Sequence, residues 1–282
     1  MTTLDRRRFL ALAGSGLAAA AAAACGDGGD SETASVNPTI SPSQAARVSP
    51  TARVEATADA GAAGLRWFGQ SMFLLTSPGG TRILLDPYNN IGYPIPPAAE
   101  TQAMAATISH EHGDHNNGAL VGSGEVIKGL TADGWAQVDK RVGDVRIYLV
   151  QAFHDNGGGA QRGRNAIFVY ETAGLKIAHL GDLGHRLSDD QLRAIGGSAD
   201  VLMVPVGGNF TVGAPEATEV IAQLKPKLVF PMHYKTPAVN LQIATVDAFL
   251  EGKTVQRVGS TNLRLSKATL PAQTTVSVLE YA

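Results

Sequence analysis

Cysteine is almost absent from this sequence of 282 residues, which contains a single one, Cys25. One cysteine cannot form a disulfide within the chain, so export and folding here do not depend on one. Aromatic residues are also few, and none lies between residues 26 and 63, where Ser, Thr, Ala, Pro and Gly dominate. Such a segment cannot bury enough apolar surface to offset the entropy of ordering. We therefore expect residues 25–63 to hold Cys25 and a disordered linker.

An excess of positive charge is missing as well, because the chain carries 23 basic and 25 acidic side chains. Residues 1–24 contain three of the arginines and one aspartate, so the remainder has 20 basic against 24 acidic residues. A mildly acidic protein lacks the electrostatic footprint that polyanion binding requires. We expect no nucleic-acid partner and a small-molecule substrate instead.

The apolar stretch from Phe9 to Ala24 is shorter than the roughly 20 residues that a membrane-spanning helix needs. Three arginines, Arg6 to Arg8, precede it. A basic start before a short apolar segment predicts an export signal over residues 1–24. The arginines followed by Phe9 and Leu10 resemble a twin-arginine leader, and an ordinary secretory leader is the alternative.

Cys25 directly follows three alanines, Ala22 to Ala24. Small residues before a cysteine at the end of a leader resemble a bacterial lipoprotein processing site, although Leu is more usual at the place of Ala22. Processing would make Cys25 the lipidated first residue, and two or more lipid chains anchor a protein stably. We therefore expect an extracytoplasmic lipoprotein anchored to the cell membrane through Cys25. Simple cleavage, with release as a secreted or periplasmic soluble protein, is the alternative.

The most informative segment is residues 110 to 115, which run His-Glu-His-Gly-Asp-His. Three imidazoles and a carboxylate within six residues are the ligand types that zinc and related divalent metals prefer. Packing alone does not require four such groups in one short segment. The segment therefore predicts a metal site, and a catalytic one, with a solvated polar loop as the alternative.

Two metal ions would need about six or seven ligands, more than this segment supplies. Further candidates each follow a short apolar segment: His154 after Val145–Phe153, Asp182 after Leu175–Leu180, and His233 after Leu228–Met232. Residues at strand ends project into loops that rigid elements hold in place. Taken alone, His154 and His233 would more commonly be hydrogen-bonded strand-end histidines, and Asp182 could be a plain turn residue.

Together these residues resemble the metallo-β-lactamase fold superfamily. The pattern His110-x-His112-x-Asp114-His115, followed by a single His, Asp and His after later strands, carries the resemblance. Four other segments are similar to the branch that includes ascorbate-6-phosphate lactonase: Leu65–Phe73, Ile83–Tyr88, Val204–Thr211 and Glu216–Lys235. The resemblance implies an α+β fold, a four-layer αββα sandwich of two mixed β-sheets flanked by helices, in one domain from residue 64 to 282.

The resemblance also implies a site for two divalent metal ions, zinc first, with manganese or iron as alternatives. His110, His112 and His154 would bind the first ion. Asp114, His115 and His233 would bind the second, and Asp182 would bridge the two. Asp114 and Asp182 are then catalytic candidates, since Asp114 would also help to orient the nucleophile.

Two neighbouring positions bear on this site. Gln70 stands where many relatives have a histidine, and its amide cannot titrate near neutral pH. A proton-transfer role at that place is therefore in doubt. Asp86 is expected to orient a metal ligand from outside the site, with a plain turn residue as the alternative.

The expected chemistry is hydrolysis. Two cations about 3.5–4 Å apart lower the pKa of a shared water to about 7, which suits attack on a small ester, lactone or phosphodiester. The alternative from another class is a non-catalytic lipoprotein that binds a metal or a small solute. His185 is a candidate catalytic residue, as a proton donor or substrate contact, against a surface loop residue. His179 alternates with Ile177 and Leu175, so we expect it to be buried and hydrogen-bonded.

The pattern also predicts individual elements. Strands over Leu65–Thr76 and Thr81–Asp86 flank one turn, and strands over Asn165–Glu171 and Leu175–Leu180 flank another. Ser188 and Gln191 form a capping box for a helix that runs to Ile195. Pro215 suits a first helical turn, and Pro226 ends that helix after Leu224. Thr245 is expected to cap a last helix through Leu250.

Overall fold

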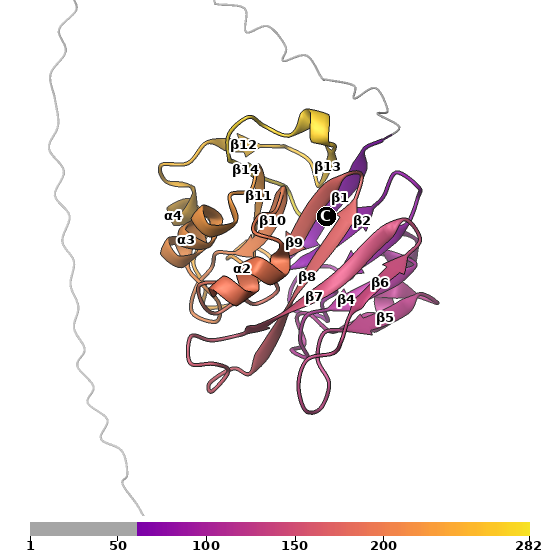
Figure 1. Cartoon of the computed structure of the whole chain (residues 1–282), viewed down its shortest axis with the longest axis horizontal. Coiled ribbons are helices and arrows are strands. Elements are labelled where there is room, and N and C mark those ends of the chain that lie inside the picture. The colour runs from indigo at the N-terminus through magenta and orange to yellow at the C-terminus, as the bar shows by residue number, and fades with distance from the viewer. Residues whose placement is uncertain (1–60) are drawn as a thin grey trace, which may run out of the picture. The chain divides into compact units, whose positions relative to one another are not determined.

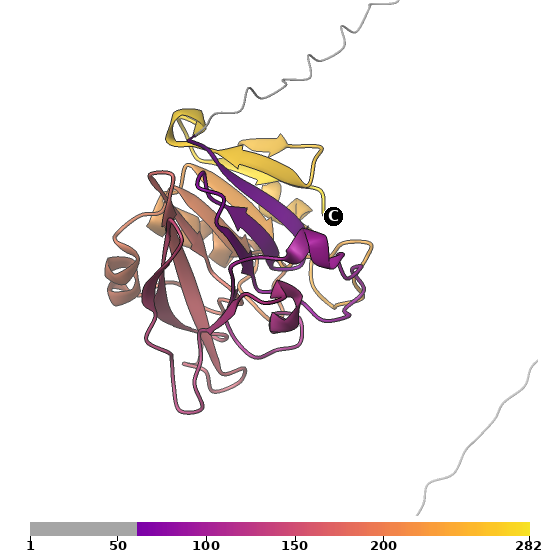
Figure 2. The ribbon, with the colours of Figure 1, turned by 90° about the vertical axis from the view of Figure 1, so that its right-hand side faces the viewer.

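The computed structural model describes residues 61–282, so the predicted leader, Cys25 and nearly all of the linker lie outside the described residues. Two β-sheets pack face to face in this part of the chain, and helices lie on their outer sides (Figure 1; Figure 2). Within residues 61–282, none of the helices combines the length and the apolar character needed to cross a bilayer.

The first sheet has six strands and is mixed. Its order is β13 (Asn262–Leu265), β1 (Ala63–Gly69), β2 (Met72–Thr76), β3 (Arg82–Leu85), β4 (Ala105–Ile108) and β5 (Glu125–Lys128). The pairs from β13 to β3 are antiparallel, whereas β3, β4 and β5 run parallel. The His-Glu-His-Gly-Asp-His segment follows β4, so it lies at the edge of this sheet where β4 ends.

The second sheet has eight strands and is also mixed. Its order is β12 (Val255–Arg257), β14 (Thr275–Val278), β11 (Leu228–Met232), β10 (Val201–Pro205), β9 (Leu175–His179), β8 (Arg164–Thr172), β7 (Val145–Phe153) and β6 (Asp139–Val142). The pairs from β12 to β9 are parallel and those from β9 to β6 are antiparallel. Every residue of β10 and β11 is buried, because parallel strands at a sheet centre are covered on both faces.

The outer layers are unequal. Helices α2 (Asp189–Ile195), α3 (Ala214–Leu224) and α4 (Asp247–Leu250) lie beside the eight-stranded sheet, where α2 contacts β7 and α3 contacts β10 (Figure 1). Within residues 61–282, the 3₁₀ helix η1 (Gly118–Val121) contacts β4 and β5 of the six-stranded sheet, and α1 (Ala98–Thr101) contacts η1. A second 3₁₀ helix, η2 (Lys267–Thr269), follows β13. The predicted four-layer αββα sandwich is thus confirmed, with one thin helical layer.

Side chains of β1 and β2 are buried on both faces of the six-stranded sheet. Trp67 and Phe73 belong to the core between the sheets, whereas Phe68 and Met72 belong to a second core with Tyr88 on the outer face. Successive residues of a strand point to opposite faces, so this alternation assigns each side chain to one of two cores. Because both faces of these strands are buried, apolar and polar residues do not alternate in this segment of the sequence.

The predicted single strand Leu65–Thr76 is wrong, because this apolar segment contains a turn. The chain reverses between Gly69 and Met72, and β1 pairs with β2 as an antiparallel hairpin. Gly69 has φ of +111°, and a Cβ atom there would lie 2.4 Å from the Tyr93 ring. Gln70 also has a positive φ, of +48°. A Gly-Gln-Ser turn within an apolar run carries too weak a signal to divide the run.

The other predicted elements mostly agree with the structure. The β8–β9 hairpin turns at residues 173–174, Ser188 and Gln191 form the capping box of α2, and α3 ends at Leu224. Thr245 is the exception, because α4 begins after Val246 and the Thr245 hydroxyl donates to the Asp247 carboxylate instead. The prediction that Thr245 caps α4 is therefore wrong.

Candidate metal centre

Each predicted metal-binding residue lies just beyond the end of a strand. His154 and His233 directly follow β7 and β11, while Asp182 comes shortly after β9. Because β9, β10 and β11 are parallel neighbours, the segments after β9 and β11 leave the same edge of the eight-stranded sheet. The segment from His110 to His115, which follows β4, comes from the six-stranded sheet. The site therefore forms where the two sheets present loops to one another.

All seven predicted side chains come together, in two clusters that share Asp182. Within each cluster the potential ligand atoms lie within 4.8 Å of one another. The first cluster consists of His110, His112, His154 and Asp182, and the second of Asp114, His115, Asp182 and His233. His112 is exposed and Asp114 partly buried, while the other five are buried. The structure thus offers two adjacent ligand sets, each open toward solvent on one side.

The Asp182 carboxylate lies between the imidazoles of both clusters. Its Oδ2 atom is 3.0 Å from His154 Nε2 and 3.3 Å from His233 Nε2. Its Oδ1 atom is 3.0 Å from His115 Nε2, yet neither of these two buried atoms has a hydrogen-bond partner within residues 61–282. A buried polar atom left unpaired costs about 1–3 kcal/mol. A divalent cation accepts both lone pairs, so the donor set fits a metal bound by nitrogen and oxygen.

Asp86 orients a histidine of each cluster from behind. Its Oδ2 atom accepts a hydrogen bond from His115 Nδ1 at 2.9 Å and another from the Ser109 hydroxyl. The Ser109 backbone N–H donates to Oδ1 at 2.7 Å. Because the Ser109 hydroxyl proton is donated to Asp86, the Ser109 oxygen accepts from His110 Nδ1 at 2.9 Å. Nδ1 of each imidazole is thus engaged behind the site and Nε2 faces into it, which supports the orienting role expected for Asp86.

Electrostatics of the clusters depend on the two carboxylates. Burial lowers the pKa of His110 to about 3, so this imidazole is neutral. Burial also acts to lower the pKa of His233, but the Asp182 carboxylate and hydrogen bonds to Asp114 and Asp182 outweigh it and raise that pKa to about 9. Burial likewise opposes ionisation of Asp182, while His115 and His233 hold its pKa well below the usual range. The second cluster thus attracts positive charge, and a metal ion binding there must displace protons.

Gln70 takes part in the site as a hydrogen-bond donor. It is fully buried, and its Nε2 donates to Asp114 Oδ2 at 2.9 Å. Its backbone oxygen accepts from the backbone N–H of His233. Gln70, Asp86 and His233 all have positive φ, of +48°, +41° and +50°. Such conformations cost free energy in residues other than glycine and concentrate at functional sites.

A pocket of about 500 Å³ opens over both clusters. Asn89, Asn90 and Ile91 of its wall come from the loop after β3, and Arg162 comes from the loop between β7 and β8. Phe210 and Leu241 complete the wall. The pocket is therefore apolar apart from the metal-binding groups, the two asparagines and one guanidinium.

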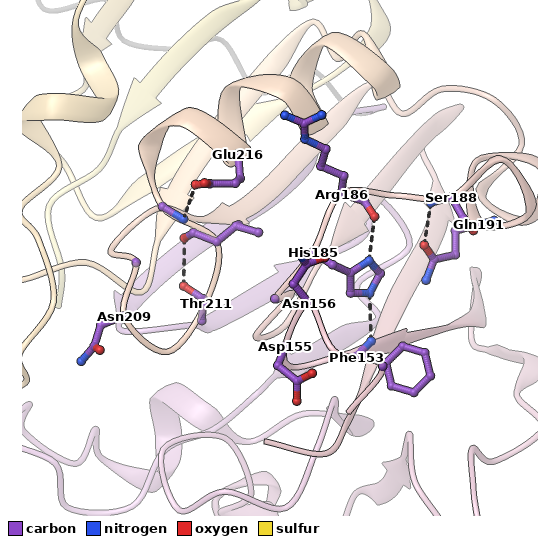
Figure 3. A pocket seen from close by; sticks show the side chains of 15 residues that line it. Phe153, Asp155, Asn156, His185, Arg186, Ser188, Gln191, Asn209, Thr211 and Glu216 are labelled. Atoms are coloured by element: carbon purple, nitrogen blue, oxygen red, sulfur yellow. Dashed lines mark hydrogen bonds between the residues drawn. The ribbon is translucent and has the colours of Figure 1, made fainter. Parts of the chain in front are cut away.

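His185 does not line this pocket. It lies in a neighbouring pocket of about 920 Å³, together with Phe153, Asn209 and Glu216 (Figure 3). Its Nδ1 donates to the Arg186 carbonyl at 2.6 Å, and its Nε2 accepts from the Phe153 N–H at 3.1 Å (Figure 3). Both ring nitrogens thus bind backbone, and the structure does not bring His185 to the clusters as it does the seven other residues.

His179 is buried and hydrogen-bonded, as expected. Its Nε2 donates to the Ser71 carbonyl at 2.9 Å, and its Nδ1 accepts from the Gly181 N–H at 3.2 Å. Neither cluster includes it. Its position ties the β1–β2 turn, which contains Gln70, to the turn that carries Asp182.

Residues that support the site were missed from the sequence. Asn165 accepts from the Asp182 N–H at 3.1 Å and donates to the Leu180 carbonyl, so it holds the turn around Asp182. Ser109 links His110 to Asp86. Asn165 is the first residue of a predicted strand and carries no distinctive signal, whereas Ser109 is identifiable only as the residue before His110.

Comparisons with known proteins were consistent with this geometry. A model of the β-lactamase superfamily domain matches residues 64–233. A UPF0173 metal-dependent hydrolase of Thermococcus onnurineus is 32% identical over 196 residues, which cover 61% of this chain and 84% of the relative. One of Anaeromyxobacter sp. is 30% identical over 226 residues, covering 68% of this chain and 82% of the relative.

The crystal structure of a metallo-β-lactamase superfamily protein from Thermotoga maritima is similar throughout its length. It has a TM-score of 0.63 and 35% sequence identity, and the match covers 78% of this chain and all of that one.

Proposed function

The chain belongs to the β-lactamase superfamily as a metal-dependent hydrolase, and on this premise we propose that it cleaves a small ester, lactone or phosphodiester at a site for two divalent metal ions. The observation that carries the proposal is the position of Asp182, whose two carboxylate oxygens face ligand atoms of both clusters. The alternative, a non-catalytic lipoprotein that binds a metal or a small solute, is not supported, because the relatives are named as hydrolases.

Zinc is the first expectation for the metal, since imidazole and carboxylate ligands suit it, with manganese or iron as alternatives. Two ions bound at such a site supply an activated water near neutral pH and polarise the bond under attack. The residues of the chain position the reactants. Asp182 connects the clusters, Gln70 holds one Asp114 oxygen, and Asp86 fixes the ring orientations of His110 and His115. Ile91, Phe210 and Leu241 form the apolar wall that limits access of water.

Substrate class is supported by the sequence. Four segments, one of which includes His233, resemble the branch that includes ascorbate-6-phosphate lactonase, which favours an ester or lactone, with a phosphodiester or a phosphorylated lactone next. A pocket of about 500 Å³ suits a small molecule. The mildly acidic composition argues against nucleic acid.

Metal analysis combined with a substrate screen tests the proposed function. Purified protein is expected to hold about two divalent ions per chain and to hydrolyse at least one member of a panel of esters, lactones and phosphodiesters. A chelator is expected to abolish this activity, and added zinc or manganese to restore it. Full activity in metal-free protein would contradict the proposal, as would complete inactivity of metal-loaded protein on all three classes.

The protein is proposed to act outside the cytoplasm, tethered to the cell membrane through Cys25 after export by the twin-arginine pathway. Support comes from Arg6 to Arg8 and from the alanines before Cys25. Replacing Cys25 by Ala is expected to move the protein from the membrane fraction to the soluble fraction, because the lipidated residue is lost. Fractionation and immunoblotting measure this. An unchanged membrane fraction would exclude the anchor, and Ser31→Ala in the linker is the control.

A further inference from the structure

We propose that Arg162 selects substrates with an anionic end group, by pairing its guanidinium with that group while the bond to be cleaved lies at the metal-binding clusters. The inference rests on the proposed function and specifies its substrate class. It starts from the composition of the pocket wall, in which Arg162 is the one basic side chain apart from the cluster histidines.

The charge of Arg162 has no carboxylate partner among the described residues. The pocket wall contains two acidic residues, Asp114 and Asp182, and both belong to the metal-binding clusters. Metal ions bound there neutralise these carboxylates, so the wall then offers no negative charge to the guanidinium. Arg162 is partly buried, and an ionic group in such a place is stabilised by a counter-charge. A substrate oxyanion would provide it, and the guanidinium binds carboxylate or phosphate through two parallel hydrogen bonds.

Arg162 is held in place by its surroundings. Its guanidinium lies over the Phe210 ring, 5.6 Å from the ring centroid, and Phe210 lines the same pocket. Its backbone N–H donates to Asp155 Oδ2 at 2.7 Å. The same carboxylate accepts backbone N–H groups of Gly157, Gly159 and Gln161, so it gathers the loop around itself. Since Asp155 directly follows His154, the loop that carries Arg162 is fixed relative to the first cluster.

The rest of the wall indicates what lies between the two ends of the substrate. Ile91, Phe210 and Leu241 are apolar and partly exposed to the pocket. A short apolar or ring-shaped body fits against them, with its scissile bond at Asp182 and its anionic group at Arg162. The competing explanation is a purely structural role, in which Arg162 only stabilises the fold through its contact with Phe210. Such a contact changes the equilibrium constant of unfolding by about tenfold or less.

Paired probes distinguish these explanations. We would compare hydrolysis of 4-acetoxybenzoate with that of 4-acetoxybenzamide, which differ in charge but hardly in size. Metal-loaded wild-type protein is expected to prefer the anion by roughly ten- to hundredfold in kcat/KM, the range for a charge-assisted hydrogen bond. Arg162→Met keeps an apolar stem over Phe210 and is expected to lose this preference, because its kcat/KM on the benzoate falls to about that on the benzamide. Arg162→Lys is expected to retain part of the preference.

Arg164→Met is the matched control. Arg164 is exposed, its guanidinium lies over the Trp135 ring, and it does not line the pocket. We expect this variant to keep the wild-type preference. Equal kcat/KM values for the two probes in wild-type protein, or an unchanged preference in Arg162→Met, would overturn the assignment of Arg162 while leaving hydrolysis established.

A binding measurement separates this inference from the proposed function. The phenols 4-hydroxybenzoate and 4-hydroxybenzamide bind without turnover, and calorimetry on metal-loaded protein gives their dissociation constants. Selective loss of benzoate affinity in Arg162→Met, by roughly ten- to hundredfold, would support the anion site even if wild-type protein cleaved neither ester. In that case the proposed ester hydrolysis would be wrong, whereas the assignment of Arg162 as an anion site would be supported. Equal benzoate affinities in Arg162→Met and wild-type protein would overturn the site.

Discussion

Replacing Asp182 by Asn is expected to reduce hydrolysis by at least about a thousandfold, since metal-dependent stabilisation of a transition state is worth several kcal/mol and each 1.36 kcal/mol is tenfold in rate. Asp182 is 2% exposed, and its carboxylate oxygens lie 3.0 to 3.3 Å from imidazole nitrogens of both clusters. Asn keeps the volume but loses the negative charge and one acceptor oxygen. The carboxylate that the two clusters share is therefore lost through a single substitution.

The measurement is kcat/KM on the substrate identified by the screen, together with the metal content of each variant. Metal content is expected to fall along with activity, while the circular dichroism spectrum stays that of a folded domain. Asp190→Asn is the matched control, because Asp190 is an exposed acid of α2 that pairs only with Arg193 on the surface. Wild-type activity in a metal-replete Asp182→Asn protein would rule out the shared-carboxylate site.

Asp86→Asn is expected to weaken metal binding by roughly ten- to hundredfold, the range found when a partner that orients a metal ligand is removed. One amide oxygen can still accept the Ser109 N–H. The amide NH₂ group, however, replaces the oxygen that accepts from His115 Nδ1 and the Ser109 hydroxyl. Donors then face donors at a site that is 1% exposed, so the free energy of unfolding is expected to fall by about 2–4 kcal/mol.

Asn is the suitable replacement because Asp86 has φ of +41°, which Asn tolerates better than Ala does. Competition with a chromogenic chelator measures metal affinity, and urea unfolding measures stability. Asp144→Asn is the control, since Asp144 also accepts hydrogen bonds from a turn, at Ser77 and Gly79, but lies exposed on the surface. If Asp86→Asn bound metal as tightly as Asp144→Asn does, Asp86 would have no orienting role.

The metal-binding residues were predictable because their chemistry is conspicuous. His110, His112, Asp114 and His115 fall within six residues, where no structural requirement explains them. His154 and His233 follow apolar segments that became β7 and β11. A rare side-chain type directly after a buried strand is informative because strand ends hold loops rigidly. The sandwich architecture came from the family resemblance, since the strand pattern alone indicates only a mixed α and β domain.

The supporting contacts of Asn165 and Gln70 were not predictable, because they depend on partners far apart in the chain. Asn165 lies 17 positions before Asp182, whose backbone N–H it accepts. Gln70 and Asp114 are separated by 44 positions. His185 shows the opposite case: it is close to Asp182 in sequence, yet its imidazole turns toward the backbone of Phe153 and Arg186. Proximity along the chain does not determine the direction of a side chain in a loop.

Local chemistry therefore established the ligand types, the strand ends that carry them and the family of the domain, because each is encoded in neighbouring residues. The division of seven ligand groups into two clusters that share Asp182 was implied by the family resemblance. Long-range packing alone decided that β1 and β2 are separate strands and that Arg162 and Phe210 meet over the pocket. These features arise from contacts between segments far apart in sequence, whose relative positions follow from the pairing of the fourteen strands of residues 61–282 into two sheets.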